Sequence, residues 1–365
     1  MPPEALLVGG FIENLMVELP LSPRSRRLGG APAALALGAL TLGVACKSSP
    51  SATVVPVAEP ALPPATAAPR EAATPFDANR AFTLVEKQVA YGPRPAGSVA
   101  LGKLREWMIE ELKSYGLKVT TQPFTAKTPS KKFPTIRMEN VIAELPGKSE
   151  DVLLIASHYD TKYMEDEVFV GANDAGSSTA VVLELARVLA AMSPEERGFP
   201  HTLQFVFFDG EEAVVEWEGN DNTYGSRHFV EKLQASGQAK RVKAMILLDM
   251  IGDADLAIPK EYQSSAWLAN ILHETGHELG YGAHFPKMTH VIADDHLPFL
   301  RAGIPAADLI DFAYGKDEVN FGPGGPDNAY WHTARDTVDK LSPRSLKIVG
   351  DTVLRALPKI ARVAR

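Results

Sequence analysis

Strand-like and helix-like segments alternate along most of this chain, and that order restricts the fold more than any other feature. The strand-like runs are apolar and lie between turn residues: 118–124, 140–145, 152–157, 202–208, 244–248 and 306–310. The helix-like stretches have the spacing of an amphipathic helix: 77–90, 98–116, 178–192, 226–234, 265–279 and 343–363. Such alternation indicates strands that run mostly in parallel, with helices on both faces of the sheet. The predicted fold class is α/β, a single α/β/α sandwich around a mostly parallel mixed sheet.

Polar residues stand where three of these apolar runs end, and they predict the position of a site. They follow the runs directly: His158 and Asp160, Glu211 and Glu212, and Asp249. In open α/β sheets, ligands bind beyond the carboxyl ends of the strands. Two further candidates lie elsewhere in the sequence: Asp174 opens a helix-like stretch, and His332 lies in a loop before the last one.

These residue types favour a metal site. Zinc binds imidazole nitrogen and carboxylate oxygen where thiolates are absent, and the single cysteine, Cys46, lies far upstream. A carboxylate at Asp160 could accept the second N–H of a metal-bound His158. Glu211 and Glu212 could divide proton transfer and metal ligation between them. Each residue alone would more simply be a solvated acid or a structural histidine, but five segments in this pattern favour a site.

The segment 1–46 resembles a targeting sequence. Three arginines precede the run 28–45, which is rich in Leu, Ala, Gly and Val and ends at Cys46. A charged region followed by an apolar one is typical of a signal peptide, and the end of the run resembles a bacterial lipoprotein processing site. A membrane-spanning helix is the alternative, which the Gly, Ala and Pro content disfavours. We expect an exported protein, a periplasmic or outer-membrane lipoprotein of a bacterium, anchored through lipid on Cys46.

Two further regions follow that segment. Residues 47–76 are rich in Pro, Ala, Ser and Thr and poor in large apolar residues, which predicts a disordered tether. Residues 77–365 form the predicted folded domain. The net charge of −8 argues against a nucleic-acid binder, which normally carries a basic patch.

The segments around the polar residues, from about Phe82 to the C-terminus, resemble the M28 family of zinc aminopeptidases. The resemblance implies metal ligands at His158, Asp174, Glu212, Asp249 and His332. It also implies that Glu211 transfers protons and that Asp160 supports a ligand. One zinc ion held by Asp174, Glu212 and His332 is expected; a second ion would be held through His158 and Asp249.

Within that family, several features resemble the animal-type glutaminyl-peptide cyclotransferases. The segment 207–229 includes Trp217, the loop 294–300 starts with Asp294, and Trp331 precedes His332. The resemblance implies a substrate pocket lined by Trp217 and Trp331, with Asp294 at its base. Such a pocket suits a short apolar stem with a polar tip, as in a glutamine side chain.

Other positions depart from that branch. Ala175 stands where the animal cyclotransferases carry serine, and Asp308 stands where they carry histidine. Both positions belong to the hydrogen-bond network around the catalytic acids, so we expect different wiring here, with Asp308 behind the reacting groups. An insert at 315–328, rich in Gly and Pro, is either a lid over the pocket or a passive surface loop.

The resemblance implies a zinc-dependent glutaminyl-peptide cyclotransferase, which converts N-terminal glutamine of peptides or proteins to pyroglutamate and releases ammonia. The expected catalytic residues are Glu211, Asp249 and Asp294. An M28-type zinc aminopeptidase that hydrolyses N-terminal residues is the alternative. A non-catalytic binding lipoprotein is a third interpretation, disfavoured because no ligand position is lost.

Overall fold

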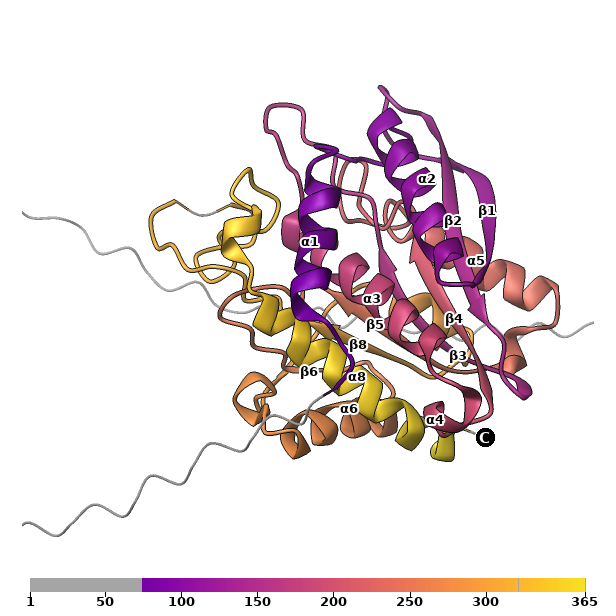
Figure 1. Cartoon of the computed structure of the whole chain (residues 1–365). Helices are drawn as coiled ribbons and strands as arrows, with labels where there is room; N and C mark the ends of the chain where they lie inside the picture. The colour runs from indigo at the N-terminus through magenta and orange to yellow at the C-terminus, as the bar shows by residue number, and fades with distance from the viewer. Residues whose placement is uncertain (1–73, 321, 365) are drawn as a thin grey trace, which may run out of the picture. The chain divides into compact units, whose positions relative to one another are not determined.

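A six-stranded sheet in the order β1-β2-β4-β3-β5-β8 runs through the computed structural model, which describes residues 74–320 and 322–364 (Figure 1). The strands of this sheet are β1 (Lys118–Lys127), β2 (Thr135–Leu145), β3 (Ser149–His158), β4 (His201–Phe208), β5 (Val242–Asp249) and β8 (Ala306–Ile310). Strands β4, β3, β5 and β8 pair in parallel, whereas β1 and β2 form an antiparallel hairpin that pairs with β4. The predicted mostly parallel mixed sheet is confirmed.

Helices cover both faces of this sheet. They are α1 (Ala78–Val89), α2 (Val99–Ser114), α3 (Ser178–Ala191), α4 (Pro194–Arg197), α5 (Tyr224–Ala235), α6 (Ala266–Glu278), α7 (His296–Arg301) and α8 (Pro343–Val363). Short helical turns are η1 (Ala172–Ser177), η2 (Ala239–Arg241), η3 (Gly282–His284) and η4 (Val338–Lys340), and β6 (Lys260–Glu261) pairs with β7 (Thr289–His290). Helices α1, α2, α3 and α8 share the face seen in Figure 1.

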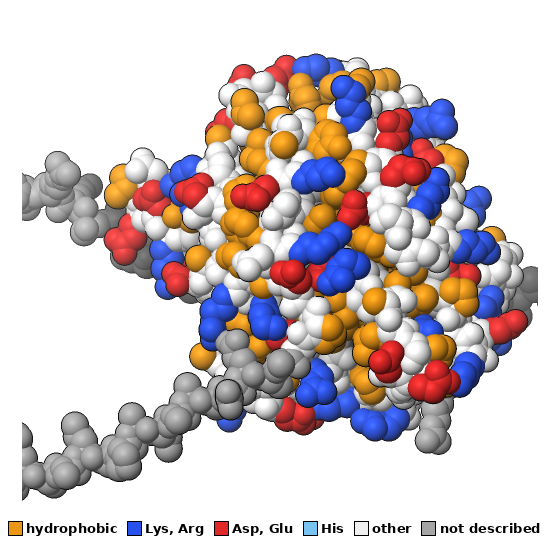
Figure 2. Space-filling model, viewed as in Figure 1, with side chains coloured by type: hydrophobic (Ala, Val, Ile, Leu, Met, Phe, Trp, Pro, Cys, Tyr) orange, Lys and Arg blue, Asp and Glu red, His pale blue; other side chains and the backbone are white. Residues whose placement is uncertain are grey.

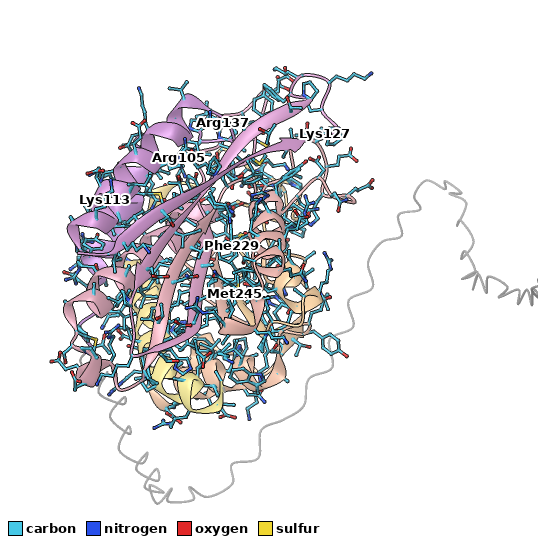
Figure 3. The ribbon with its side chains drawn as sticks, turned by 90° about the vertical axis from the view of Figure 1, so that its right-hand side faces the viewer. Arg105, Lys113, Lys127, Arg137, Phe229 and Met245 are labelled. Carbon is cyan, nitrogen blue, oxygen red and sulfur yellow. The ribbon has the colours of Figure 1, made fainter. Side chains whose placement is uncertain are left out.

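Successive side chains of a strand point to opposite faces of the sheet, so each central strand contributes to two apolar cores, one on each face. In β3, Leu153 and Ile155 join the core under α1, α3 and α8. Leu154 lies in the second core, with Phe229 of α5 and Met245 of β5 (Figure 3). The parallel strands are buried on both faces, which explains their nearly continuous apolar sequence.

All six expected strands and all six expected helices are present, with shifted ends. The hairpin is longer than predicted, since β1 runs to Lys127 and β2 begins at Thr135. The apolar runs end where polar side chains begin, but β1 and β2 continue to pair through their backbones beyond that point. The short helix α7 was not predicted, because six residues show too little periodicity.

The predictions for 1–46 and for the part of the tether 47–76 that precedes residue 74 concern residues outside the described ones, and so does the lipid on Cys46. The boundary at residue 77 also stays a prediction. Asp77 caps α1, and its side chain accepts the backbone N–H of Asn79 and Arg80. Among the described residues, no helix is both long enough and apolar enough to cross a membrane.

Candidate active site

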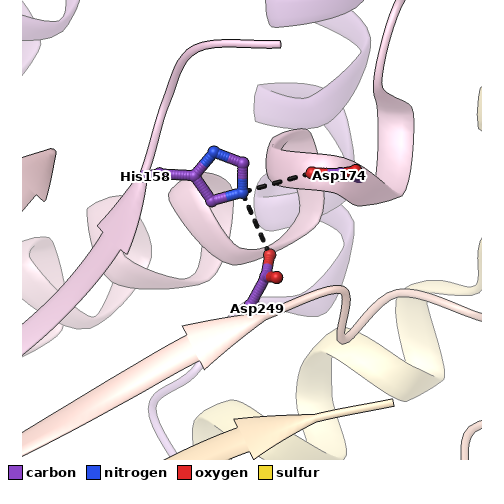
Figure 4. A group of neighbouring side chains, drawn as sticks. All are labelled: His158, Asp174 and Asp249. Carbon is purple, nitrogen blue, oxygen red and sulfur yellow. Dashed lines mark hydrogen bonds and ion pairs between the residues drawn. The ribbon is translucent and has the colours of Figure 1, made fainter. Parts of the chain in front are cut away.

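Two strand ends and one helical turn bring the first group of polar side chains together. His158 ends β3, Asp249 ends the neighbouring strand β5, and Asp174 lies in η1, just before α3 (Figure 4). His158 Nε2 lies 3.2 Å from Asp174 Oδ1 and 3.2 Å from Asp249 Oδ1. All three residues are buried. This group could hold a metal ion, since its candidate ligand atoms lie within 4.8 Å of one another.

A second group shares Asp174 with the first. His332 Nε2 lies 3.4 Å from Asp174 Oδ2 and 3.2 Å from Glu212 Oε1. The candidate ligand atoms of Asp174, Glu212 and His332 also lie within 4.8 Å of one another. Each oxygen of Asp174 therefore faces a different histidine, which is the arrangement of a carboxylate that can serve two neighbouring metal positions.

The donor set fits a divalent cation electrostatically. Burial lowers the pKa of His332, but the nearby carboxylates of Glu212 and Asp174 outweigh it and raise that pKa to about 9. Burial also favours neutral Asp174, whereas hydrogen bonds to His158 and His332 lower its pKa below the usual range. Buried carboxylates at this density attract positive charge. Imidazole nitrogen and carboxylate oxygen are ligands that zinc accepts.

Asp336, for which the sequence carried no signal, fixes the backbone at Asn173 and Asp174 through hydrogen bonds. Its buried carboxylate accepts the backbone N–H of Asn173 at 2.8 Å and of Asp174 at 3.1 Å, and the hydroxyl of Tyr314 donates to it at 2.8 Å. The buried guanidinium of Arg94 donates to the Val170 carbonyl at 2.8 Å, a few residues upstream. Neither Asp336 nor Arg94 belongs to a motif that names its role, so only the fold reveals them.

Asp160 forms its hydrogen bonds with the backbone of the turn after β4, and its contact with His158 is longer. Its carboxylate accepts the backbone N–H of Glu211 at 3.1 Å and of Glu212 at 3.4 Å. The expected contact to His158 is longer, with Nδ1 3.6 Å from Asp160 Oδ1. Asp160 therefore fixes the backbone of Glu211 and Glu212, and with it the direction of their side chains.

Glu211 lies beside the metal groups without belonging to either of them. Burial raises the pKa of Glu211 well above its ordinary value; nearby His158 opposes this rise, and Asp294 adds to it. Glu211 Oε2 lies 3.8 Å from His158 Nδ1. A buried carboxyl group with a raised pKa beside a metal position is suited to accept and return a proton.

A buried acidic group lies behind Glu211. Burial raises the pKa of Asp308 well above its usual range, and the charges of Asp294 and Asp249 raise it further. Burial likewise raises the pKa of the neighbouring Asp295 to about 7, although Ser226 donates a hydrogen bond to it. The sequence pattern indicated roles for Asp294 and Asp308 but none for Asp295.

His296 and Glu261 complete this group and were also missed. His296 Nε2 lies 3.2 Å from Glu261 Oε2, and its Nδ1 lies 3.7 Å from Asp308 Oδ2. His296 thus places an imidazole beside Asp308, which stands at the position where, by the resemblance, the animal cyclotransferases carry histidine. Glu261 lies in β6, a two-residue strand with no signal in the sequence.

A pocket of about 260 Å³ opens onto these residues. Glu211, Asp249 and Asp294 lie in it together with the second metal group, and its walls are Trp217, Trp331, Phe312, Val291 and Ile292. Trp331 stacks on His332 with ring centroids 3.8 Å apart, whereas Trp217 is 37% exposed. Of the described residues in the insert 315–328, none lines this pocket.

The fold and the site define a class of α/β/α proteins in which candidate His and carboxylate metal ligands gather at the carboxyl edge of a mixed sheet. Residues 140–357 match the model of peptidase family M28. A glutaminyl-peptide cyclotransferase of Drosophila melanogaster is 30% identical over 264 residues, which cover 67% of this chain and 70% of that protein. The chain belongs to peptidase family M28, a zinc-dependent family.

Solved structures agree with this assignment. A glutaminyl cyclase of an Acidobacteriales bacterium has a TM-score of 0.73 and 37% identity, and the match covers 82% of this chain and 100% of that chain. A Zn-dependent exopeptidase of Parabacteroides distasonis has a TM-score of 0.67 and 25% identity, with 78% of this chain and 99% of that chain covered. The expected resemblance to this family and to glutaminyl cyclases is confirmed.

Proposed function

We propose that this chain is a zinc-dependent glutaminyl-peptide cyclotransferase, with residues 77–365 as its catalytic domain. The observation that carries the proposal is the pocket, which Glu211 and Asp294 line together with the two tryptophans Trp217 and Trp331. A glutamine side chain is short and apolar along its stem and polar at its tip, as this lining requires. The names of the similar proteins support the same activity.

The residues that would hold the metal are those of the two His–carboxylate groups. Asp174, Glu212 and His332 would hold one zinc ion in this proposal. His158 and Asp249 would, with Asp174, hold a second ion only in the aminopeptidase alternative. When bound, zinc supplies a Lewis acid that polarises the side-chain carbonyl of the substrate glutamine.

Glu211 moves the proton in the proposed reaction. The α-amine of the substrate attacks the side-chain carboxamide carbon of the same residue, so a C–N bond closes the five-membered ring. Glu211 takes a proton from that amine and returns it to the departing amide nitrogen, which leaves as ammonia when its C–N bond breaks. Both reacting groups belong to one residue, so correct orientation removes much of the entropic cost.

The remaining pocket residues orient the substrate and exclude water. Asp249 and Asp294 are placed to accept the N–H groups of the substrate amide, because both line the pocket beside Glu211. Trp331 and the 37% exposed Trp217 line the pocket, so in this proposal they cover the ring-closing atoms of the substrate. Exclusion of water matters since water would divert the reaction from cyclisation to hydrolysis.

One observation favours an aminopeptidase as the second candidate. The two oxygens of Asp174 face His158 and His332 separately, at 3.2 and 3.4 Å, so the chain offers ligands for two neighbouring ions. In that case Glu211 would accept a proton from an attacking water molecule, and the first peptide bond would break. The similarity to a Zn-dependent exopeptidase supports this alternative.

The two functions differ in their products. The purified zinc-loaded protein is incubated with a Gln-initiated peptide, and the peptide mass is followed. Loss of ammonia from an otherwise intact peptide is expected, whereas release of a free N-terminal residue would establish the aminopeptidase. The same peptide with an acetylated N-terminus serves as control and should not react, because its amine cannot attack.

We also propose that the protein is exported and anchored by lipid on Cys46. The charged and apolar pattern before Cys46 supports this, as does the Pro/Ala-rich segment after it. Labelling of cells with a fatty acid tests the proposal. The wild-type chain should carry label, and label that persists in Cys46→Ser would exclude attachment at this residue.

A further inference from the structure

A second pocket lies at the opposite edge of the sheet from the active site. It has a volume of about 320 Å³ and lies between α8, the end of α3 and the short helix α4, and we call it the α8 pocket. Helix α3 begins near the metal groups at the carboxyl edge, so Leu189 near its end lies at the amino edge, as does Phe199 just before β4. None of the residues that line the α8 pocket lines the active-site pocket.

A largely buried arginine with two unpaired guanidinium nitrogens lines this pocket. Arg197 ends α4, lines the α8 pocket and is only 6% exposed. Its Nε and Nη1 atoms are enclosed by protein and have no hydrogen-bond acceptor. Among the described residues, no carboxylate forms an ion pair with its guanidinium: the charge of Glu195 acts on Arg197 from beyond ion-pair distance, and Glu195 itself pairs with Lys148 at 2.8 Å. A buried charge without a counter-ion is unfavourable, and an anion in the pocket would offset that cost.

Three further basic side chains surround the same space. Arg355, Lys359 and Arg362 follow one another along α8 at spacings of four and three residues, which places them on one face of the helix. Lys359 pairs with Glu278, but neither Arg355 nor Arg362 has an ion pair within the described part of the chain. Figure 2 shows Lys and Arg side chains near the lower edge of the molecule, where α8 ends.

The acidic content of the pocket is small. Glu196 is the one carboxylate among its lining residues, and Glu196 Oε2 already accepts the backbone N–H of Ser193 at 2.7 Å. The four basic residues of the lining therefore give the pocket a net positive charge. This excess of positive charge attracts an anion.

The remaining lining is apolar. Leu189, Met192, Phe199, Leu354 and Pro358 supply carbon surface next to the guanidinium groups. A bare inorganic ion would leave that surface in contact with water. A ligand with an anionic head and an apolar stem would cover both parts.

We propose that the α8 pocket binds a phosphate group carried on an apolar stem. The planar guanidinium fork matches the tetrahedral oxygens of phosphate, and arginine is the preferred residue for such contacts. Thr74, the first described residue, also lines the pocket, so the proposed lipid-anchored segment joins the domain at this face. A phospholipid head group and a soluble phosphate ester share this chemistry.

Calorimetric titration of the full-length chain with inorganic phosphate tests the site. We expect saturable binding to the wild type. The double variant Arg355→Gln/Arg362→Gln should weaken it at least about tenfold, since each lost charge-assisted contact costs roughly that factor. Both residues are exposed, so the double variant should fold. Lys240→Gln is the control, because Lys240 is also exposed but lies outside this pocket.

A second variant and a second probe separate the remaining outcomes. Arg197→Lys keeps the charge and loses the fork, and it should weaken phosphate binding while activity on Gln-peptides stays unchanged. For the vesicle test, both proteins carry Cys46→Ser, so that no lipid anchor can retain them. If the phosphate belongs to a lipid, vesicles of phosphatidylglycerol should retain the protein with the native pocket and retain less of the double variant. Phosphate binding without vesicle binding would assign a soluble ester. Equal phosphate affinity in the double variant and in Lys240→Gln, or no binding at all, would overturn the proposal.

Discussion

The backbone N–H of Asp174 donates a hydrogen bond of 3.1 Å to the side chain of Asp336, 162 residues further along the chain. The acid that faces both histidines is thus held in place by another acid, and Asp336 reaches it from the loop that also carries His332. Metal geometry in this site therefore depends on a residue that contributes no ligand atom to either group.

Substitution Asp336→Asn should weaken zinc binding without unfolding the protein. The amide keeps one acceptor oxygen, so one of the two backbone N–H groups at Asn173 and Asp174 loses its partner. A loss of about 10- to 100-fold in zinc affinity is expected for a residue that supports metal ligands in this way. Competition with a chelating dye measures it. Asp339→Asn, on the exposed segment nearby, is the control, and equal affinities of the two variants would contradict this role.

Removal of zinc should abolish activity and lower the melting temperature. Without a cation, the carboxylates of Asp174, Glu212 and Asp249 remain buried close to one another. A metal at 100 times its dissociation constant stabilises the folded state by about 2.7 kcal/mol. Differential scanning calorimetry before and after chelation checks the shift, and added zinc should reverse it. An unchanged melting temperature after confirmed zinc loss would reject these groups as the metal site.

Glu211→Gln should reduce kcat by about 10²- to 10⁴-fold, the usual contribution of a general acid–base group. Glu211 belongs to neither metal group, so the zinc content of the variant should equal that of the wild type. Elemental analysis alongside steady-state kinetics measures both quantities. Substantial remaining activity would show that another group transfers the proton.

The pH dependence of kcat/KM should reflect the ionisation of Glu211. Burial raises the pKa of this carboxyl group well above its ordinary value, and the charge of Asp294 raises it further. The ionised form is the base, so kcat/KM should fall as the pH drops through that raised pKa. Asp294→Asn removes one negative neighbour and should move the acidic limb to lower pH. A limb in the ordinary glutamate range for the wild type would contradict the assignment.

Two glycine substitutions should change stability in opposite directions. A Cβ at Gly225 would lie 2.5 Å from Asn140 Oδ1 and 2.6 Å from the Asp209 carbonyl oxygen, so Gly225→Ala should destabilise by about 1–3 kcal/mol. A Cβ at Gly102 in α2 meets only the end of the Arg105 side chain, at 3.8 Å, and Gly102→Ala should stabilise by about 0.5–1 kcal/mol. Urea unfolding of both variants compares them, and the same sign for both would show that this crowding does not govern the outcome.

Much of the architecture could be predicted from the sequence, because strands buried on both faces need long apolar runs. The runs before His158 and Asp249 therefore marked both strand ends at which these residues lie. The antiparallel pairing of β1 with β2 was not specified, because periodicity within a strand does not record its direction relative to a neighbour.

The sequence by itself determined which chemistry the site offers: imidazole and carboxylate groups that can bind a metal, two adjacent glutamates, and aromatic rings at recognisable positions. Only the tertiary structure decided how these groups are held, since Asp336 and Glu261 reach the site from distant segments without a motif of their own. It also placed Arg197 and Arg362 in one pocket. The physical reason is that burial, the direction of a hydrogen bond and the sum of nearby charges depend on distances in space, which the order of residues does not specify.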